Sequence, residues 1–224
     1  MKSQQQGFTL IEIAIVLVII GLLLGGVLKG QELITSARVR NMISQQDGIK
    51  AAYFGFLDRY RALPGDYAAA KVNIKDATKD GNGNGQIELK NANNDNESIL
   101  VWEHLSKAGF INGSYIYAAA DSDTTTPKNP YSGYLQLIYD KDYGDPAAAA
   151  TTASRHNLKT GIQVPVNILA EVDRKIDDGK PYGGAFQFSE YAGGGTKPDV
   201  AKCVKTSDWN VAGEENNCGA ASIF

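Results

Sequence analysis

The hydrophobic pattern begins with one uninterrupted apolar stretch near the start of the chain. From Phe8 to Leu28 there are 21 residues, and Glu12 is the only charged one among them. About 20 apolar residues in a helix cross the hydrocarbon core of a membrane. The stretch therefore predicts a membrane-spanning helix. A carboxylate at that depth costs roughly 2.5–3.5 kcal/mol on insertion scales, so Glu12 predicts a functional group with a cationic partner.

The helical period continues well beyond the membrane-length stretch. Apolar positions recur every three to four residues and predict one stripe along a helix: Val39, Met42, Ile43, Gln46, Ile49, Tyr53, Phe56 and Tyr60. Pro64 follows soon after Tyr60 and favours the end of the helix there. We therefore expect one long helix whose second half packs against a globular domain. Local unwinding is expected at three glycines, each costing ~1 kcal/mol of helix propensity: Gly25, Gly26 and Gly30.

The remainder of the chain combines short helical and strand patterns with long polar segments. Helices are predicted at residues 97–105 and 165–176. Strands are predicted at residues 134–139, 162–164 and 185–188. The expected fold class is α+β, in which a long N-terminal spine helix packs on a small antiparallel β-sheet with long loops.

Composition and charge narrow the functional classes. Outside the apolar stretch roughly 195 residues remain, enough for one domain with a sizeable core. The net charge is −3 and there is no long basic run, so nucleic-acid binding is not indicated. The only two histidines, His104 and His156, stand in unrelated contexts and provide no catalytic constellation. We therefore do not expect an enzyme.

The two cysteines, Cys203 and Cys218, are separated by 14 residues close to the C-terminus. In an oxidising compartment such a pair predicts a disulfide, whose loop-closure contribution is ~3 kcal/mol. The alternative of two free thiols in a cytosolic protein is disfavoured by the membrane-type helix.

The segment starting at Asp80 alternates oxygen-bearing side chains with glycine, as calcium loops of the EF-hand type do. The candidate calcium ligands are Asp80, Asn82, Asn84, Gln86 (through its carbonyl) and Glu88. The pattern departs from the EF-hand at its twelfth position, which is Asn91 instead of a bidentate glutamate. Affinity would be modest unless another carboxylate folds back: Asp76, Asp95 or Glu97. The alternative is a flexible Asn/Gly turn.

Three further carboxylates, Asp173, Asp177 and Asp178, lie at the end of the predicted second helix. They could ligate a metal ion, but a solvated helix terminus followed by a turn explains them more simply.

The start of the chain adds a specific signature. A short polar leader ending in Gly7 precedes Phe8-Thr9-Leu10-Ile11-Glu12 and the apolar stretch. This order resembles the signature of type IV prepilins, which type IV pilins share with the pseudopilins of type II secretion. The resemblance implies that prepilin peptidase cuts between Gly7 and Phe8 and that Phe8 is then N-methylated. It also implies that Glu12 pairs with the terminal amine of a neighbouring subunit during assembly. A plain signal anchor with an incidental glutamate is the alternative.

This resemblance also implies an organisation. Residues 1–7 would be the leader, 8–28 the transmembrane and filament-core helix, 29–63 the amphipathic half of the spine, and 64–224 the globular domain. The N-terminus would face the cytoplasm while the subunit is stored in the inner membrane, and the assembled filament would lie in the periplasm or at the cell surface. Basic residues follow the span more densely than they precede it, opposite to the positive-inside rule. We give the leader signature precedence over that rule.

The expected function is that of a structural subunit in a type IV pilus-like filament. Its partners would be other pilin-like subunits, prepilin peptidase and an inner-membrane assembly platform. A pseudopilin of a type II secretion system is the main alternative, and a membrane-anchored enzyme or a tip adhesin is less favoured. The calcium-like loop followed by the helix with Trp102 and His104 resembles a group of larger pilin-like proteins with the same leader.

Overall fold

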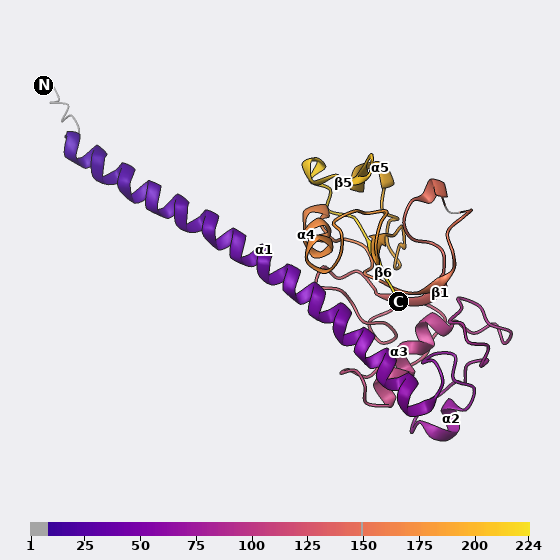
Figure 1. Ribbon diagram of the computed structural model, residues 1–224. Helices are drawn as coiled ribbons and strands as arrows, with labels where there is room; N and C mark the ends of the chain where they lie inside the picture. The colour runs from indigo at the N-terminus through magenta and orange to yellow at the C-terminus, as the bar shows by residue number, and fades with distance from the viewer. Residues whose placement is uncertain (1–8, 149) are drawn as a thin grey trace, which may run out of the picture. The chain divides into compact units, whose positions relative to one another are not determined.

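Figure 1 shows the computed structural model, which describes residues 9–148 and 150–224. The predicted cleavage site at Gly7 and Phe8 lies outside the described residues. The chain divides into two compact units with the boundary after Arg38.

Helix α1 (Leu10–Tyr60) is 51 residues long. The expected unwinding was wrong, because Gly25, Gly26 and Gly30 all lie inside continuous helix. The physical reason is cooperativity: a residue added to an existing helix gains a hydrogen bond without a new nucleation cost, and leucine-rich flanks offset the low propensity of glycine. In the first unit the apolar side chains from Leu10 to Leu28 are exposed. The helix is long and apolar enough to cross a membrane, and its most apolar 18-residue window is not buried at all.

In the second unit, the predicted stripe of α1 is confirmed. Its buried residues recur with helical spacing: Val39, Met42, Gln46, Ile49, Ala52, Tyr53 and Phe56. Ile43 and Tyr60 are partly buried and pack beside them. This half of the helix therefore belongs to the core of the globular unit.

The globular unit contains a four-stranded antiparallel sheet in the order β1-β2-β6-β3. Its strands are β1 (Gln136–Asp140), β2 (Arg155–Lys159), β6 (Ala220–Ile223) and β3 (Phe186–Phe188). A separate hairpin joins β4 (Val204–Lys205) to β5 (Asp208–Trp209). The strands predicted at 134–139 and 185–188 are confirmed as β1 and β3. The strand predicted at 162–164 was wrong, because only Val164 forms an isolated bridge, with Cys218.

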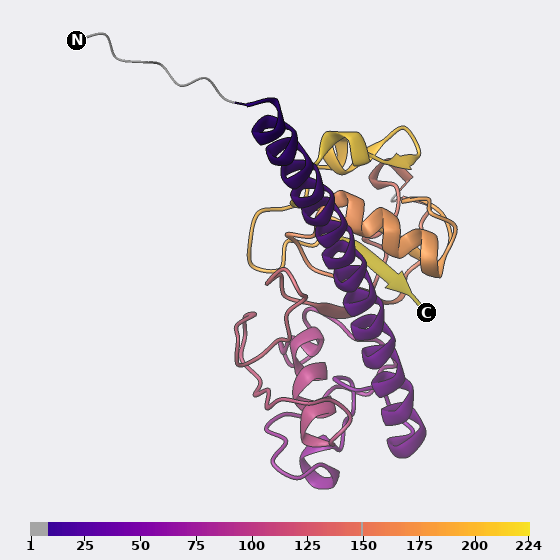
Figure 2. The same cartoon turned by 90° about the vertical axis from the view of Figure 1, so that its left-hand side faces the viewer.

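Two longer helices complete the unit, α3 (Glu97–Lys107) and α4 (Val166–Ile176), and both were predicted. The shorter elements are α2 (Ala70–Asn73), α5 (Val200–Cys203), and the 3-10 turns η1 (Pro146–Ala148) and η2 (Val211–Gly213). Figures 1 and 2 place α3 and α4 at opposite ends of the globular unit, with the sheet between them. Each helix has its own core cluster. One joins Val39 and Met42 to α4, and the other joins Phe56 to Trp102 of α3.

Candidate functional site

The N-terminal end of α1 is closed by a reciprocal contact between Thr9 and Glu12. The Glu12 carboxylate accepts hydrogen bonds from the Thr9 N–H at 2.8 Å and from its hydroxyl at 2.7 Å. The Glu12 N–H in turn donates to the Thr9 hydroxyl at 3.3 Å. This is a capping box, which satisfies backbone donors that the first turn of a helix leaves unpaired.

The capping role of Thr9 was not anticipated, although the spacing Thr-x-x-Glu before an apolar run is its sequence signal. Glu12 therefore has a partner within its own helix before any assembly. The pairing of Glu12 with a neighbour's amine remains a prediction, because Phe8 is outside the part of the chain that is described.

The calcium-like loop at residues 80–91 is held in shape by hydrogen bonds among its own side chains and backbone N–H groups. The Glu88 carboxylate accepts hydrogen bonds from the amide nitrogens of Asn82 at 3.2 Å and Asn84 at 2.8 Å. The Asn82 and Asn84 side-chain oxygens accept the N–H groups two residues ahead, at 2.9 and 2.8 Å. Asp80 instead faces α2, where it accepts the Lys71 N–H at 2.8 Å. Among the five predicted ligand residues, Asn82, Asn84 and Glu88 are thus in contact, whereas Asp80 is turned toward α2.

Two carboxylates from outside the predicted ligand set hold this loop, and the first is Asp66. Its side chain is 4% exposed and accepts the backbone N–H groups of Asn84 at 3.0 Å and Gly85 at 2.8 Å. Gly81 runs so close to the Asp66 backbone that a Cβ there would lie 2.2 Å from the Asp66 carbonyl carbon. Burial is the main cause that raises the pKa of Asp66, and the nearby Glu88 charge raises it further.

The second is Glu97, at the start of α3, with no exposed surface. Its carboxylate accepts the N–H of Asn82 at 3.0 Å, the N–H of Glu88 at 3.2 Å and the side-chain amide of Asn91 at 2.8 Å. Burial raises the pKa of Glu97, and the charge of Asp66 adds to this rise. Glu97 is one of the three carboxylates expected from the sequence to fold back on the loop, whereas Asp66, 14 residues before the loop, lies outside that pattern.

The loop carries more negative charge than its protein partners neutralise. Within the described ranges, neither Asp66 nor Glu97 forms an ion pair with a lysine or arginine. Together with Glu88, these residues make three carboxylates at the loop. Carboxylate, amide and carbonyl oxygens are the ligand atoms that calcium prefers. The oxygens of Asp66 and Glu97 accept N–H groups of this loop, so the two residues place negative charge beside the candidate ligands without being ligands themselves. Calcium binding stays a prediction.

The predicted disulfide is confirmed: Cys203 and Cys218 are bonded, with their Cα atoms 5.8 Å apart. Both are fully buried in the core cluster around α4. The bond links the end of α5 to the segment before β6.

The remaining chemical candidates have structural roles. His104 is buried, accepts the Gly65 N–H at 3.0 Å, and has its other ring nitrogen 3.0 Å from the Lys79 carbonyl. Burial lowers the His104 pKa, which favours a neutral ring that ties two loops to α3. Asp173 accepts the Trp209 indole N–H at 2.7 Å and the Gly179 N–H at 3.2 Å.

Asp173, Asp177 and Asp178 do come together, with carboxylate oxygens within 4.8 Å of one another. Asp177 accepts the N–H groups of Ala185 and Phe186 at the start of β3. Asp173 and Asp177 therefore have a structural role, because their hydrogen bonds fix the segments that follow the C-terminal end of α4.

Comparison with known families gives one match. The family model described as the prokaryotic N-terminal methylation motif matches residues 2–28. No curated protein gives a significant match to the chain, and neither does any solved structure. The match covers the apolar stretch, Glu12 and the predicted processing site.

An apolar helix of membrane length with a methylation motif at its start, leading into an α+β unit, defines a pilin-like class of protein. The chain accordingly fits a type IV pilin-like protein.

Proposed function

We propose that the chain is a structural subunit of a type IV pilus-like filament. Prepilin peptidase would remove residues 1–7 on the cytoplasmic side, and the mature subunit would be stored in the inner membrane before assembly. An assembly platform there would then add it to a filament of pilin-like subunits at the cell surface. The observation that carries the proposal is the methylation motif placed directly on an unburied apolar helix.

The physical driving force for assembly would be burial of that helix. From Leu10 to Leu28 its large side chains are exposed within the chain, which outside a membrane would be unfavourable for each residue. A filament core made of the same helices from neighbouring subunits provides an apolar environment that replaces the membrane. Glu12 would supply the register by pairing with the Phe8 amine of a neighbour.

The second candidate is a pseudopilin, a subunit of the short periplasmic filament of a type II secretion system. The calcium-like loop favours it, because calcium-stabilised loops resembling this one occur in pseudopilins. Both candidates use the same processing and the same helix, so the location of the mature protein distinguishes them.

Mass spectrometry of surface filaments sheared from cells, compared with the membrane fraction, tests the proposal. A mature mass beginning at methylated Phe8 in the sheared fraction supports the pilus subunit. A mature mass confined to membranes supports the pseudopilin, and an uncut N-terminus in both fractions refutes either role.

We further propose that the loop at residues 80–91 binds calcium through Asn82, Asn84, Glu88 and the Gln86 carbonyl, with Asp80 at its start. The buried charges of Asp66 and Glu97 would add to its attraction for the ion. Binding to the folded state alone stabilises it by RT ln(1 + [L]/Kd), about 2.7 kcal/mol at a hundredfold excess over Kd.

The test is thermal unfolding of the full chain in EDTA, with excess CaCl2, and with MgCl2 as the matched control. A rise in the melting temperature with calcium, absent in Glu88→Gln, supports the proposal. Equal melting temperatures with and without calcium refute it.

A further inference from the structure

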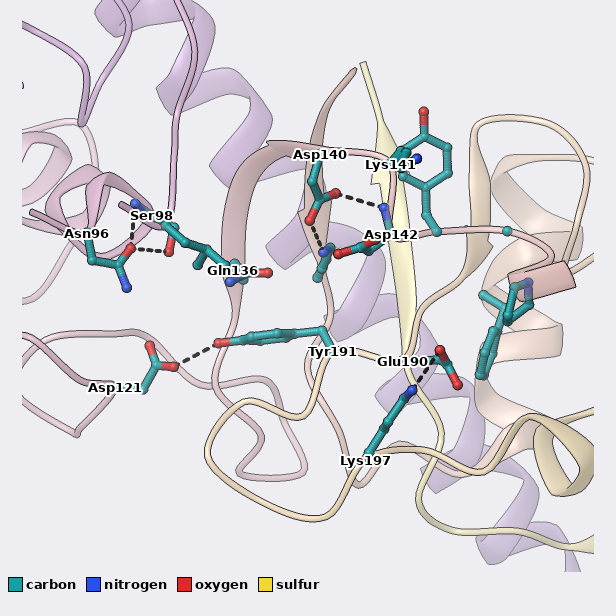
Figure 3. A pocket seen from close by; sticks show the side chains of 16 residues that line it. Asn96, Ser98, Asp121, Gln136, Asp140, Lys141, Asp142, Glu190, Tyr191 and Lys197 are labelled. Carbon is teal, nitrogen blue, oxygen red and sulfur yellow. Dashed lines mark hydrogen bonds and ion pairs between the residues drawn. The ribbon is translucent and has the colours of Figure 1, made fainter. Parts of the chain in front are cut away.

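A cavity of about 500 Å³ opens in the globular unit on the side of the sheet near β1 and β2 (Figure 3). Its wall is built by strands, by the start of α3 and by loops that are distant in sequence. Its polar lining includes Ser98, Gln136, Asp140, Lys159, Glu190 and Tyr191. Leu89 of the calcium-like loop also lines the cavity, whereas none of the candidate calcium ligands does.

The floor of the cavity holds an ammonium group that the protein satisfies only in part. Lys159 is 3% exposed and forms an ion pair with Asp140. Its Nζ also lies 5.9 Å from the centroid of the Tyr191 ring. An ammonium group has three N–H donors, and Asp140 is its only hydrogen-bond acceptor among the described residues. The other donors are left for water or for a molecule bound in the cavity.

The side-chain amide of Gln136, next to Lys159, has no hydrogen-bond partner among the described residues. Gln136 pairs with Lys159 across β1 and β2, so the two side chains lie next to each other on one face of the sheet. Gln136 is 6% exposed, and its amide makes no hydrogen bond within the described chain. The Gln136 amide atoms are not among the fully enclosed atoms that lack a partner, so they keep some accessible surface where the residue lines the cavity. A molecule in the cavity can therefore bind this amide.

Other polar side chains of the cavity wall already have partners within the protein. The Tyr191 hydroxyl donates to Asp121 at 2.9 Å, and Glu190 pairs with Lys197 at 2.9 Å. Ser98 donates to Asn96 at 2.7 Å. Figure 3 shows Gln136 and Ser98 on one side of the cavity and Glu190 with Lys197 on the other. The charges that line the cavity nearly cancel, with Asp121, Asp140, Asp142 and Glu190 opposite Lys141, Lys159 and Lys197.

The geometry points to a binding site for a neutral sugar residue, such as one unit of a surface glycan. Sugar hydroxyls both donate and accept, so they can satisfy the amide of Gln136 and the spare donors of Lys159 together. A rigid aromatic ring such as Tyr191 offers the apolar face that packs against a sugar ring. The volume falls in the range of small-molecule sites. Because Lys159 is already neutralised by Asp140, an anionic ligand gains little here.

Ligand-observed NMR by saturation transfer tests this site on the full chain, purified in a zwitterionic detergent whose head group contains no sugar. The probes are the methyl glycosides of glucose, galactose, mannose and N-acetylglucosamine, with glucuronate and inorganic phosphate as charged comparators. We expect at least one neutral glycoside to bind, and Gln136→Leu to weaken that binding at least tenfold. The melting temperature of this variant should stay unchanged, since the amide has no partner in the protein.

Gln187→Leu, which replaces a glutamine outside the cavity wall, is the matched control and should bind as the parent does. Tyr191→Leu removes the ring and provides a second variant should Gln136→Leu fail to fold. Absence of binding by every neutral glycoside overturns the proposal. So does tighter binding of glucuronate or phosphate, or unchanged binding by folded variants of both positions.

Discussion

Glu97 is the residue whose replacement most directly tests how the loop at residues 80–91 is held. In Glu97→Gln one carboxylate oxygen becomes an NH2 group, which cannot accept the hydrogen bonds that now reach that position. At least one buried donor, the N–H of Asn82 or Glu88 or the amide of Asn91, is left unpaired. Hydrogen bonds to charged groups contribute about 1.5–3 kcal/mol each.

The substitution also removes a buried negative charge, which is stabilising and opposes the loss of hydrogen bonds. Burial raises the pKa of Glu97, which shows that the charged form is disfavoured there. We therefore expect Glu97→Gln to lower the free energy of unfolding by about 2 kcal/mol at pH 7, in the lower part of the range for one hydrogen bond to a charged group. In a unit of this size that corresponds to a melting temperature lower by roughly 4–8 °C. Circular dichroism of the full chain in detergent measures it. Glu171→Gln, an exposed glutamate beside Arg174, is the control and should stay within about 0.5 kcal/mol of the parent.

Hydrogen exchange adds a local readout to the same experiment. The Asn82 and Glu88 amides should exchange faster in Glu97→Gln, whereas the Asn84 and Gly85 amides are held by Asp66 and should change less. A variant with the parent's melting temperature and unchanged exchange at Asn82 and Glu88 would refute the organising role of Glu97.

Four further predictions follow from other contacts. Burial raises the pKa of Asp173 to about 6 from 3.8, so this group's contribution to the free energy of unfolding should fall by ~3 kcal/mol as pH rises from about 4 to 6. The difference in stability between the parent and Asp173→Asn, taken from melting curves across that range, should change accordingly. Replacing Cys203 and Cys218 together by serine should lose about 3 kcal/mol, measured by urea unfolding. Phe56→Ala should cost about 3–5 kcal/mol in the same assay, because the ring is fully buried. Glu12→Ala should still be processed after the leader yet yield few sheared filaments, and a normal filament yield would contradict its role in assembly.

The elements that could be predicted from the sequence are those whose signal is local. The apolar run and the spacing of the stripe through Phe56 are enough to predict helix α1. The spacing of apolar residues on one face predicts α4 in the same way. The family match rests on the same local signal near the start of the chain.

The missed elements depend on partners far along the chain. Strand β2 reads Arg155-His156-Asn157-Leu158-Lys159, a polar segment whose burial becomes favourable only because Asp140 on β1 pairs with Lys159 and Asn157. Strand β6 has small side chains and no alternating pattern of its own. At the calcium-like loop, spacing indicated the ligands within the loop, whereas Asp66 reaches it only through the folded chain.

The place of β6 in the sheet has a consequence for the order of events during folding. Ala220–Ile223 lies between β2 and β3, so the sheet has no continuous centre until this strand arrives. Phe224 completes the arrangement, donating its N–H to the His156 carbonyl and packing its ring against Tyr53 of α1. The sheet therefore cannot close until residues 220–223 have paired, and an intermediate that lacks this pairing leaves β2 and β3 with unpaired edges that could pair with another chain.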